Sequence, residues 1–424
     1  MNFQTAKGVR DLPPEEKILK NQVVDTIRKT FELSGFSPLE TPTIERYETL
    51  AAKFGAGADS DALKETFMLE DQGGRKLGLR FEMTTSLARY VAMNPTIKMP
   101  FKSSQIGPVF RDGPIKLGRE REFWQCDVDV VGSRSMMAEV ELISILTSVF
   151  RELEIPFIIK INNRKILNGI LNQAGIKDVK GALIALDKLD KIGQVGVEKE
   201  MRDKGYTPSQ IKKLFSFISD KTTLSSIKKN LTDEGGKEGI RELEIILNYL
   251  KLLKIKEIDF DVSLARGQAY YTGTVIEAYA TKSTVNSSIA GGGRYDQMIG
   301  NFVGGNREIP AVGVSFGLTP LMEVLKNKTP LTKKTVAKVL VLPINTEEKS
   351  ILIAQELREK GISVDFALIS KGVSKNLEYA NSLGISKVLI IGENELKKNK
   401  VLLRDMVSGT EQLLSLAQAV KKLQ

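Results

Sequence analysis

The stretch GREREFWQCDVDVVG, residues 118–132, contains the pattern that most constrains the fold. Gln125, Asp127 and Asp129 occupy every second position, and successive side chains of a β-strand point to opposite faces of the sheet. The spacing therefore predicts a strand over 122–131 with these three polar groups on one face. Two interpretations of the carboxylates stay open, because they can pair with nearby arginines or belong to a functional site.

Arginines cluster beside this strand. A second strand is expected over 105–111, and the loop between the two strands contains Gly113, Pro114 and Gly118. Guanidinium groups can grip a carboxylate or a triphosphate and stabilise charge that develops at phosphorus. An exposed hairpin is the alternative explanation for such a cluster. The arginines that stand beside glycines or carboxylates are Arg111, Arg119, Arg121, Arg266 and Arg294.

Further along the chain, two aromatic and glycine-rich segments follow. Tyr270 and Tyr271 are expected on opposite faces of a strand over 270–280, where packing in a core or an interface is the ordinary role for either ring. The glycines at 291–293 are expected to form a turn. They precede Arg294 and Tyr295, and a buried strand is expected over 310–316.

The length of 424 residues indicates two or three domains. Residues 1–164 and 255–326 carry most of the strand patterns and form the predicted core. Residues 165–254 read as an inserted helical domain, with short helical patterns between lysine-rich turns. Residues 327–335 have the composition of a linker. In residues 336–424, strands alternate with helices at 338–344, 347–360, 362–368, 373–383 and 387–392, which indicates an α/β domain with a parallel sheet.

Composition excludes several kinds of chemistry. The chain has no histidine, and its single cysteine, Cys126, cannot form an internal disulfide. Zinc cages of cysteine and histidine, Ser-His-Asp triads and Cys-His pairs are therefore excluded. The P-loop and the dinucleotide-binding glycine pattern are also absent. The sequence contains no membrane-span pattern and no secretory leader, so a soluble, cytoplasmic protein is expected.

The positive charge is unevenly distributed. The whole chain has a formal charge of +10, yet residues 1–164 and 255–330 together contain 30 basic and 30 acidic residues. The excess lies in residues 165–254 and 331–424, which carry +5 each. A nucleic-acid backbone is the natural partner for such segments. A lysine-rich surface that serves only solubility is the alternative.

Seven stretches resemble those of one family, in its order and spacing. Over nearly its whole length the chain resembles histidyl-tRNA synthetase, a class II aminoacyl-tRNA synthetase. The resemblance implies an α+β fold, with a class II antiparallel sheet core, a helical insertion and a C-terminal α/β anticodon-binding domain. The stretches are GVRDLPPEE (8–16), LRFEMT (79–84), QIGPVFR (105–111), GREREFWQCDVDVVG (118–132), LARGQAYYTGTVIE (264–277), AGGGRYD (290–296) and PAVGVSFGL (310–318).

The resemblance implies an activity and its partners. ATP would activate L-histidine to histidyl-adenylate, and the histidyl group would pass to the 3′ end of tRNA(His), with release of pyrophosphate and AMP. ATP and Mg²⁺ are the implied cosubstrate and cofactor, with no metal held by protein side chains. The segment around Pro42 would form a homodimer interface. No membrane or DNA partner is expected.

Residue roles carry over by position. Arg111 and Arg266 would be the catalytic residues, in contact with the α-phosphate and, for Arg266, the substrate carboxylate. The histidine-binding residues would be Glu82, Thr84, Gln125, Asp129, Arg266, Tyr270, Tyr271 and Tyr295. The ATP-binding residues would be Arg111, Arg119, Arg121, Phe123, Gly313, Ser315 and Gly317.

The chain departs from the family where adenine is bound. The family often ends its last motif with an arginine that covers adenine, whereas Gly317-Leu318 is followed here by Thr319-Pro320. Arg121, Arg294 or Arg307 could compensate. Two other functions stay open. One is the regulatory subunit of ATP phosphoribosyltransferase, a relative without tRNA charging that usually lacks the C-terminal domain. The other is an RNA-binding protein without catalysis, which would leave the arginines and carboxylates of the neutral core unexplained.

Overall fold

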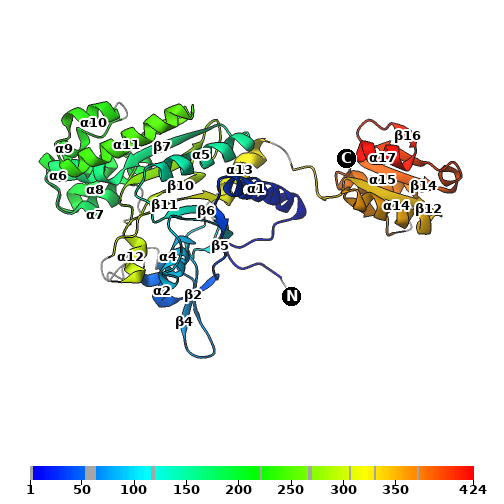
Figure 1. Cartoon of the computed structure of the whole chain (residues 1–424), viewed down its shortest axis with the longest axis horizontal. Helices are drawn as coiled ribbons and strands as arrows, with labels where there is room; N and C mark the ends of the chain where they lie inside the picture. Colours follow the sequence, from blue (N-terminus) through cyan, green and yellow to red (C-terminus); the bar gives the residue numbers. More distant parts are fainter. Residues whose placement is uncertain are drawn as a thin grey trace. The chain divides into compact units, whose positions relative to one another are not determined.

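The computed structural model describes residues 3–52, 64–115, 120–219, 222–265, 270–304, 307–328, 331–369 and 372–424 (Figure 1). Its contacts divide the chain into two compact units. The first unit comprises Met1–Arg10 and Val23–Lys328, and the second comprises Asp11–Gln22 and Thr329–Gln424. None of the described helices is long and apolar enough to cross a membrane.

An eight-stranded sheet is the framework of the first unit. Its five inner pairings are antiparallel, and only the two edge pairings, β1 with β5 and β7 with β8, are parallel. The predicted antiparallel core is therefore confirmed. In spatial order the strands are β1 (Ser37–Pro38), β5 (Phe101–Phe110), β6 (Glu122–Val131), β11 (Ala311–Gly317), β10 (Ala290–Arg294), β9 (Thr274–Ala280), β7 (Phe157–Asn163) and β8 (Ile258–Phe260).

Aromatic side chains hold two helices against one face of this sheet. Phe31, near the end of α1 (Pro14–Leu33), and Phe150 of α5 (Met137–Glu152) both contact Phe316 of β11, with ring centroids 6.0 and 5.6 Å apart. All three side chains are fully buried. Burying such rings contributes strongly to folding, because each removes a large apolar area from water. This face of the sheet is the apolar core of the first unit.

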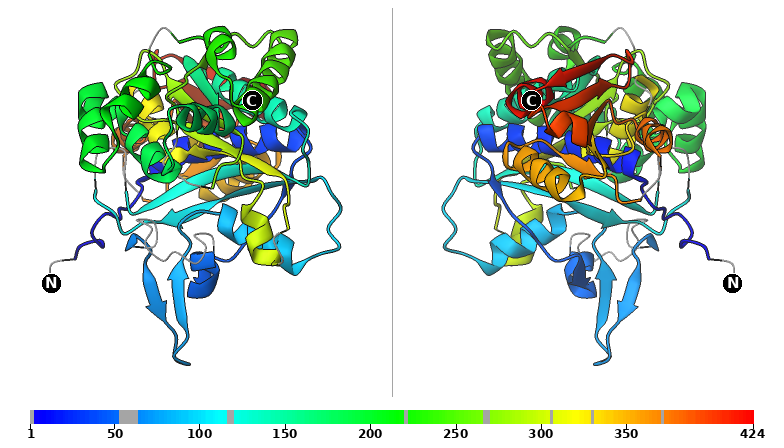
Figure 2. Two further views of the ribbon diagram at one scale, coloured as in Figure 1. Left: turned by 90° about the vertical axis from the view of Figure 1, so that its left-hand side faces the viewer. Right: turned by 90° about the vertical axis from the view of Figure 1, so that its right-hand side faces the viewer.

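Short helices and a small sheet lie at the other end of the first unit. Leu87 of α4 (Thr84–Met93) packs with Met298 and Ile299 of α12 (Met298–Val303). Helix α2 (Tyr47–Ala52) directly follows β2, the first strand of a three-stranded sheet in the order β2-β4-β3. Both views of Figure 2 show the β3–β4 hairpin projecting from this end. The small sheet consists of β2 (Ile44–Arg46), β4 (Lys76–Leu79) and β3 (Met68–Glu70).

The segment between β7 and β8 is helical, as predicted. Asn163 begins it by accepting a hydrogen bond from the Lys165 amide, an N-cap that satisfies a free amide of the first turn. These helices belong to the first unit with the sheet, and the predicted domain limits stay a prediction. The helices are α6 (Arg164–Gln173), α7 (Val179–Leu186), α8 (Leu189–Asp203), α9 (Pro208–Phe215), α10 (Leu224–Asn230) and α11 (Glu234–Leu252); α13 (Leu318–Lys328) ends the unit.

The second unit contains a five-stranded sheet in the order β13-β12-β14-β15-β16. The three predicted strands pair in parallel, as expected for strands joined by helices. Two further strands pair antiparallel beyond β14, and the sequence analysis missed them. The elements are β12 (Val339–Ile344), α14 (Glu347–Glu359), β13 (Val364–Phe366), α15 (Val373–Ser382), β14 (Lys387–Gly392), α16 (Glu393–Leu396), β15 (Val401–Asp405), β16 (Glu411–Leu414) and α17 (Leu416–Leu423).

Two local predictions were wrong. The glycines at 291–293 form the middle of β10 rather than a turn, paired on both sides by β9 and β11. Pairing with two long neighbours overrides the weak strand preference of glycine. The strand predicted over 270–280 begins only at Thr274, so Tyr270 and Tyr271 precede it.

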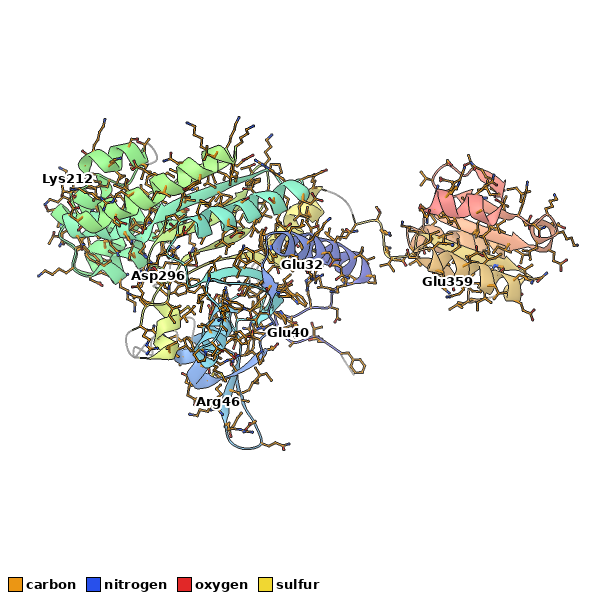
Figure 3. All side chains as sticks on the ribbon, in the orientation of Figure 1. Glu32, Glu40, Arg46, Lys212, Asp296 and Glu359 are labelled. Atoms are coloured by element: carbon orange, nitrogen blue, oxygen red, sulfur yellow. The ribbon has the colours of Figure 1, made fainter. Side chains whose placement is uncertain are left out.

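A buried ion pair joins α5 to β10. Arg294 donates from Nε and Nη2 to the two carboxylate oxygens of Glu139, both at 2.7 Å, and the Arg294 and Glu139 side chains are 3% and 0% exposed. Arg294 also donates to the Ser133 carbonyl and to Asp296, which is labelled in Figure 3. Asp296 in turn accepts from the Ala311 amide. Arg294 is therefore a structural residue that ties the helix layer to the sheet.

We expect Glu139→Gln to destabilise the protein by about 3 kcal/mol, because the buried Arg294 guanidinium loses its fully buried anionic partner and keeps only the Asp296 carboxylate at 3.3 Å. Urea unfolding measures the change. The matched control is Glu308→Gln, which breaks the exposed Arg134–Glu308 pair at 3.0 Å and should barely move the unfolding midpoint. Equal effects of the two variants would contradict the structural role of Glu139.

Candidate active site

A cavity of about 840 Å³, part of it open to solvent, lies on the sheet face opposite Phe316. Strands β6, β10 and β11 supply most of its wall. All predicted site residues that the structure describes line the cavity, except Arg121. The lining residues are Glu82, Thr84, Arg111, Phe123, Gln125, Asp127, Asp129, Tyr270, Tyr271, Ser288, Ile289, Ala290, Gly291, Gly292, Tyr295, Gly313, Val314, Ser315 and Gly317.

Asp129 lies at the closed part of the cavity, and Tyr295 orients it. The Tyr295 hydroxyl donates to Asp129 Oδ1 at 2.5 Å, and both residues are buried. Burial raises the pKa of Asp129 well above its ordinary value, and the neighbouring carboxylate of Asp127 raises it further. Gly313 pairs with Asp129 across β6 and β11, and a Cβ there would lie 1.8 Å from Asp129 Oδ1. Only glycine leaves room for this carboxylate.

Asp127 and Gln125 continue the polar face of β6. Ser315 lies opposite Asp127 on β11, accepts a hydrogen bond from Gln125 Nε2 at 2.7 Å and is a hydrogen-bond partner of Asp127. Burial raises the pKa of Asp127 to about 7, and the charge of Glu82 adds to this shift. The buried oxygens Asp127 Oδ1 and Gln125 Oε1 have no partner in the described structure. The predicted shared face of the three side chains is confirmed.

Glu82 is held at the N-terminus of α4. Its Oε1 accepts hydrogen bonds from the Thr85 amide, at 2.9 Å, and from the Thr85 hydroxyl. The positive end of the helix dipole favours an anion there. Thr84, the first residue of α4, lines the cavity beside it. Glu82 and Thr84 therefore present acceptor oxygens at one end of the cavity.

The tyrosine pair does not divide between two faces, as predicted for a strand. Tyr270 and Tyr271 lie before β9 with ring centroids 4.6 Å apart, and both line the cavity. Tyr270 also meets Tyr295 edge to face at 6.2 Å. The irregular backbone before β9 turns both rings inward, because the strict alternation of a strand begins only at Thr274.

Arg111 lies between two aromatic rings. Its guanidinium is 4.3 Å from the centroid of Phe81 and 4.9 Å from that of Phe123, and it lines the same cavity. Such stacking, together with a hydrogen bond from Arg111 Nε to the Phe81 carbonyl, orients the guanidinium in the cavity. One cavity is therefore lined by a cation, Arg111, and by the carboxylates of Glu82, Asp127 and Asp129.

The remaining arginines are placed differently. Arg121 pairs with Asp112 at 2.9 Å and does not line the cavity. Arg294 is buried, is bonded to Glu139, Asp296 and the Ser133 carbonyl, and does not line the cavity, so the suggestion that it compensates for the missing adenine-covering arginine is wrong. Arg119 and Arg266 lie outside the described residues.

Sequence reasoning missed part of the wall. Asp127 was recognised only as a member of the polar face, and Ser288, Ile289, Gly291 and Val314 were not predicted at all. The alternation of polar residues was a usable signal for Asp127. Backbone-lined positions such as Gly291 carry no side-chain signal, because their exposure depends on which strands become neighbours.

We expect the stability of the wild type, relative to Asp127→Asn, to fall as the pH rises. Below the ordinary pKa of 3.8 the carboxyl is protonated in both the folded and unfolded states. Between 3.8 and about 7 only the folded state keeps the proton, so this contribution decreases through that window. The difference should change by about 3 kcal/mol between about pH 5 and about pH 8 in urea unfolding. Parallel pH curves for the two proteins would contradict the raised pKa.

The comparisons with known proteins agree over nearly the whole chain. A family model for histidyl-tRNA synthetase matches residues 8–321, and one for an anticodon binding domain matches residues 338–424. Histidine-tRNA ligase 1 of Bacillus cereus is 42% identical over 417 residues, which are 97% of each chain. Histidine-tRNA ligase of Clostridium tetani is 38% identical and covers 98% of this chain and 96% of its own.

Solved structures agree with these matches. Histidyl-tRNA synthetase from Nostoc sp. PCC 7120 has a TM-score of 0.87 and 31% sequence identity, covering 100% of this chain and 99% of its own. An ATP phosphoribosyltransferase regulatory subunit/histidyl-tRNA synthetase from Bacillus halodurans C has a TM-score of 0.74 at 22% identity, a likeness of fold alone. The chain belongs to the histidyl-tRNA synthetase family.

Proposed function

We propose that this protein activates L-histidine with ATP and transfers the histidyl group to the 3′ end of tRNA(His). In the first step a carboxylate oxygen of histidine attacks the α-phosphorus of ATP, and pyrophosphate leaves. In the second step a terminal ribose hydroxyl of the tRNA attacks the acyl carbon, and AMP leaves. Neither step requires a protein nucleophile, which is compatible with a chain that contains no histidine. The proposed reaction implies a cytoplasmic location, where charged tRNA is used.

The proposal rests on one observation: a single cavity is lined by both buried carboxylates and a stacked arginine. Histidine has an α-ammonium and an imidazole that need acceptors, and a carboxylate that must approach a phosphate. Glu82, Thr84 and Gln125 would receive the α-ammonium. Asp129 and the tyrosines would receive the imidazole nitrogens. A pocket whose buried polar groups need these partners rejects apolar amino acids strongly.

Arg111 would neutralise charge at the α-phosphate during the attack. Alignment of the two reactants and stabilisation of developing charge by a fixed guanidinium can supply most of the acceleration in such a transfer. Arg266 is proposed to share this role and to contact the substrate carboxylate. Arg119 and Arg121 are proposed for the distal phosphates.

The adenine would stack on Phe123 beside the glycine-lined wall at Gly313, Ser315 and Gly317. The described residues contain no cluster of three ligating acids, and the buried carboxylates of the cavity are placed for a cationic ligand. Mg²⁺ is therefore proposed to enter with ATP, where it would neutralise phosphate charge while held mainly by phosphate oxygens and water.

The second unit has features that favour binding of tRNA, which the transfer step requires. Residues 338–424 match the anticodon binding domain model, and residues 331–424 carry a net charge of +5, which favours a nucleic-acid backbone. The regulatory alternative has no such support, since its likeness here is one of fold. A binding protein without catalysis would leave the polar cavity without a function.

Pyrophosphate exchange into ATP tests the proposal. We expect exchange with histidine and with no other amino acid, in the presence of Mg²⁺. Failure of the folded protein to exchange with histidine, with tRNA also supplied, would contradict the charging function and favour the regulatory one.

Two cavity variants test the roles assigned to Glu82 and Arg111 independently of each other. Glu82→Gln should raise the KM for histidine, because it removes the negative charge that receives the α-ammonium. Arg111→Ala should lower kcat for exchange by about 10²–10³, the usual cost of losing a charge-stabilising donor. Histidine affinity measured by calorimetry should fall in the first variant and change little in the second. The reverse pattern would contradict the roles assigned to these two residues.

We also propose a homodimer through the small sheet. Ile44 of β2 and Leu69 of β3 are 50% and 40% exposed on the same face of this sheet, and they are apolar side chains of the kind that interfaces cover. Ile44→Asp should shift the mass measured by light scattering from dimer toward monomer. The control Leu252→Asp changes a side chain that is 76% exposed on α11 and should leave the mass unchanged. A wild-type monomer would contradict the proposal.

A further inference from the structure

The N-terminal segment Gly8–Arg10 lies across the hairpin formed by β5 and β6. The Arg121 amide donates to the Gly8 carbonyl at 2.8 Å, and the Arg111 amide donates to the Arg121 carbonyl, also at 2.8 Å. Two backbone hydrogen bonds therefore link Gly8 to Arg121 and Arg121 to Arg111. We call this three-residue arrangement the backbone ladder. The segment adds a third chain at the loop end of the hairpin, next to the cavity that Arg111 lines.

Side chains fasten the segment to the same hairpin. Arg10 Nε donates to Glu120 Oε1 at 2.6 Å, and the two side chains are 39% and 28% exposed. Arg121 donates from Nε to the Gly113 carbonyl and pairs through Nη1 with Asp112 at 2.9 Å. The Arg121 guanidinium is thus held from the hairpin, while its backbone is held from the N-terminal segment.

Gly8 is the closest point of contact. Its φ of +81° lies in the region that favours glycine, and a Cβ at this position would lie 2.7 Å from Arg121 Cγ and 2.8 Å from Arg121 Cδ. Any larger side chain would push the stem of Arg121 away or lift the segment off the hairpin. The sequence therefore has the one residue at this position that allows the ladder to form.

We propose that Gly8–Arg10 is a positioning strap for ATP: it fixes Arg121 and, through the shared ladder, the backbone of Arg111. This proposal rests on the proposed function, because it assumes that these arginines meet ATP. The residues of the strap do not line the cavity. Gly8 and Arg10 are accordingly positioning residues, and their effect should fall on ATP and spare histidine, whose predicted ligands Glu82 and Asp129 are held by Thr85 and Tyr295.

Gly8→Ala is the primary test, with Gly74→Ala as its matched control. Gly74 has a similar φ of +72°, but a Cβ there would meet no atom within 4 Å. Both variants share the backbone strain, and only Gly8→Ala displaces Arg121. At saturating histidine we expect Gly8→Ala to raise the KM for ATP in pyrophosphate exchange by about tenfold or more relative to Gly74→Ala, since small misplacements of binding groups are costly. The KM for histidine and the melting temperature should match the control.

The ion pair gives a second test. Arg10→Ala should raise the KM for ATP, and Arg10→Lys should restore much of it because the pair with Glu120 can re-form. Arg28→Ala, which breaks the exposed Arg28–Asp25 pair at 2.6 Å, is the control and should change neither KM. An ATP KM equal to the control in both Gly8→Ala and Arg10→Ala would overturn the strap, as would equal losses for ATP and histidine.

Hydrogen exchange separates this proposal from the proposed function. The Arg121 and Arg111 amides should exchange faster in Gly8→Ala than in Gly74→Ala without any ligand, and equal rates would overturn the strap. If the wild type shows no histidine-dependent exchange of pyrophosphate into ATP, the proposed charging function is contradicted. A direct ATP-binding measurement then decides the strap, which is overturned if the ATP affinity of Gly8→Ala equals that of Gly74→Ala.

Discussion

The pairing of β6 with β11 is the constraint on which the site depends. It sets Ser315 opposite Asp127 and Gly313 opposite Asp129. One residue of slip would move all these side chains to the other face of the sheet, because side chains alternate along a strand. The carboxylates would then enter the apolar layer, and the cavity would lose its polar floor. The register of this strand pair therefore decides which side chains face the cavity.

Burying several carboxylates is unfavourable, and the opposite face of the sheet offsets that cost. Desolvation raises the pKa of both Asp127 and Asp129, because the charged form of a carboxyl group is disfavoured when it is buried. On the other face, Phe31, Phe150 and Phe316 pack in a fully buried cluster. A cationic ligand would relieve the repulsion among the acids. The same arrangement that costs stability thus creates selectivity for a ligand with an ammonium group.

The net positive charge lies in segments other than those that form the cavity. The core segments are formally neutral, and the positive excess lies in residues 165–254 and 331–424. A polyanion would therefore be attracted to the helical segment and to the second unit, while the cavity keeps a local balance of acids and Arg111. Because the positive excess lies in these two segments, a long nucleic acid can bind there while the small-molecule site keeps its own balance of charge.

The sequence by itself determined most strands, the helical segment, the parallel part of the second sheet and the shared face of Gln125, Asp127 and Asp129, because these follow from local periodicity. It also identified the family through seven stretches. Only the tertiary structure decided which of the described arginines line the cavity. Arg111 and Arg294 both stand beside glycine-rich strands, yet Arg294 is taken by Glu139, 155 residues away in the chain. Such a pairing depends on how α5 packs against β10, and long-range contacts decide that packing, whereas local sequence patterns do not record it.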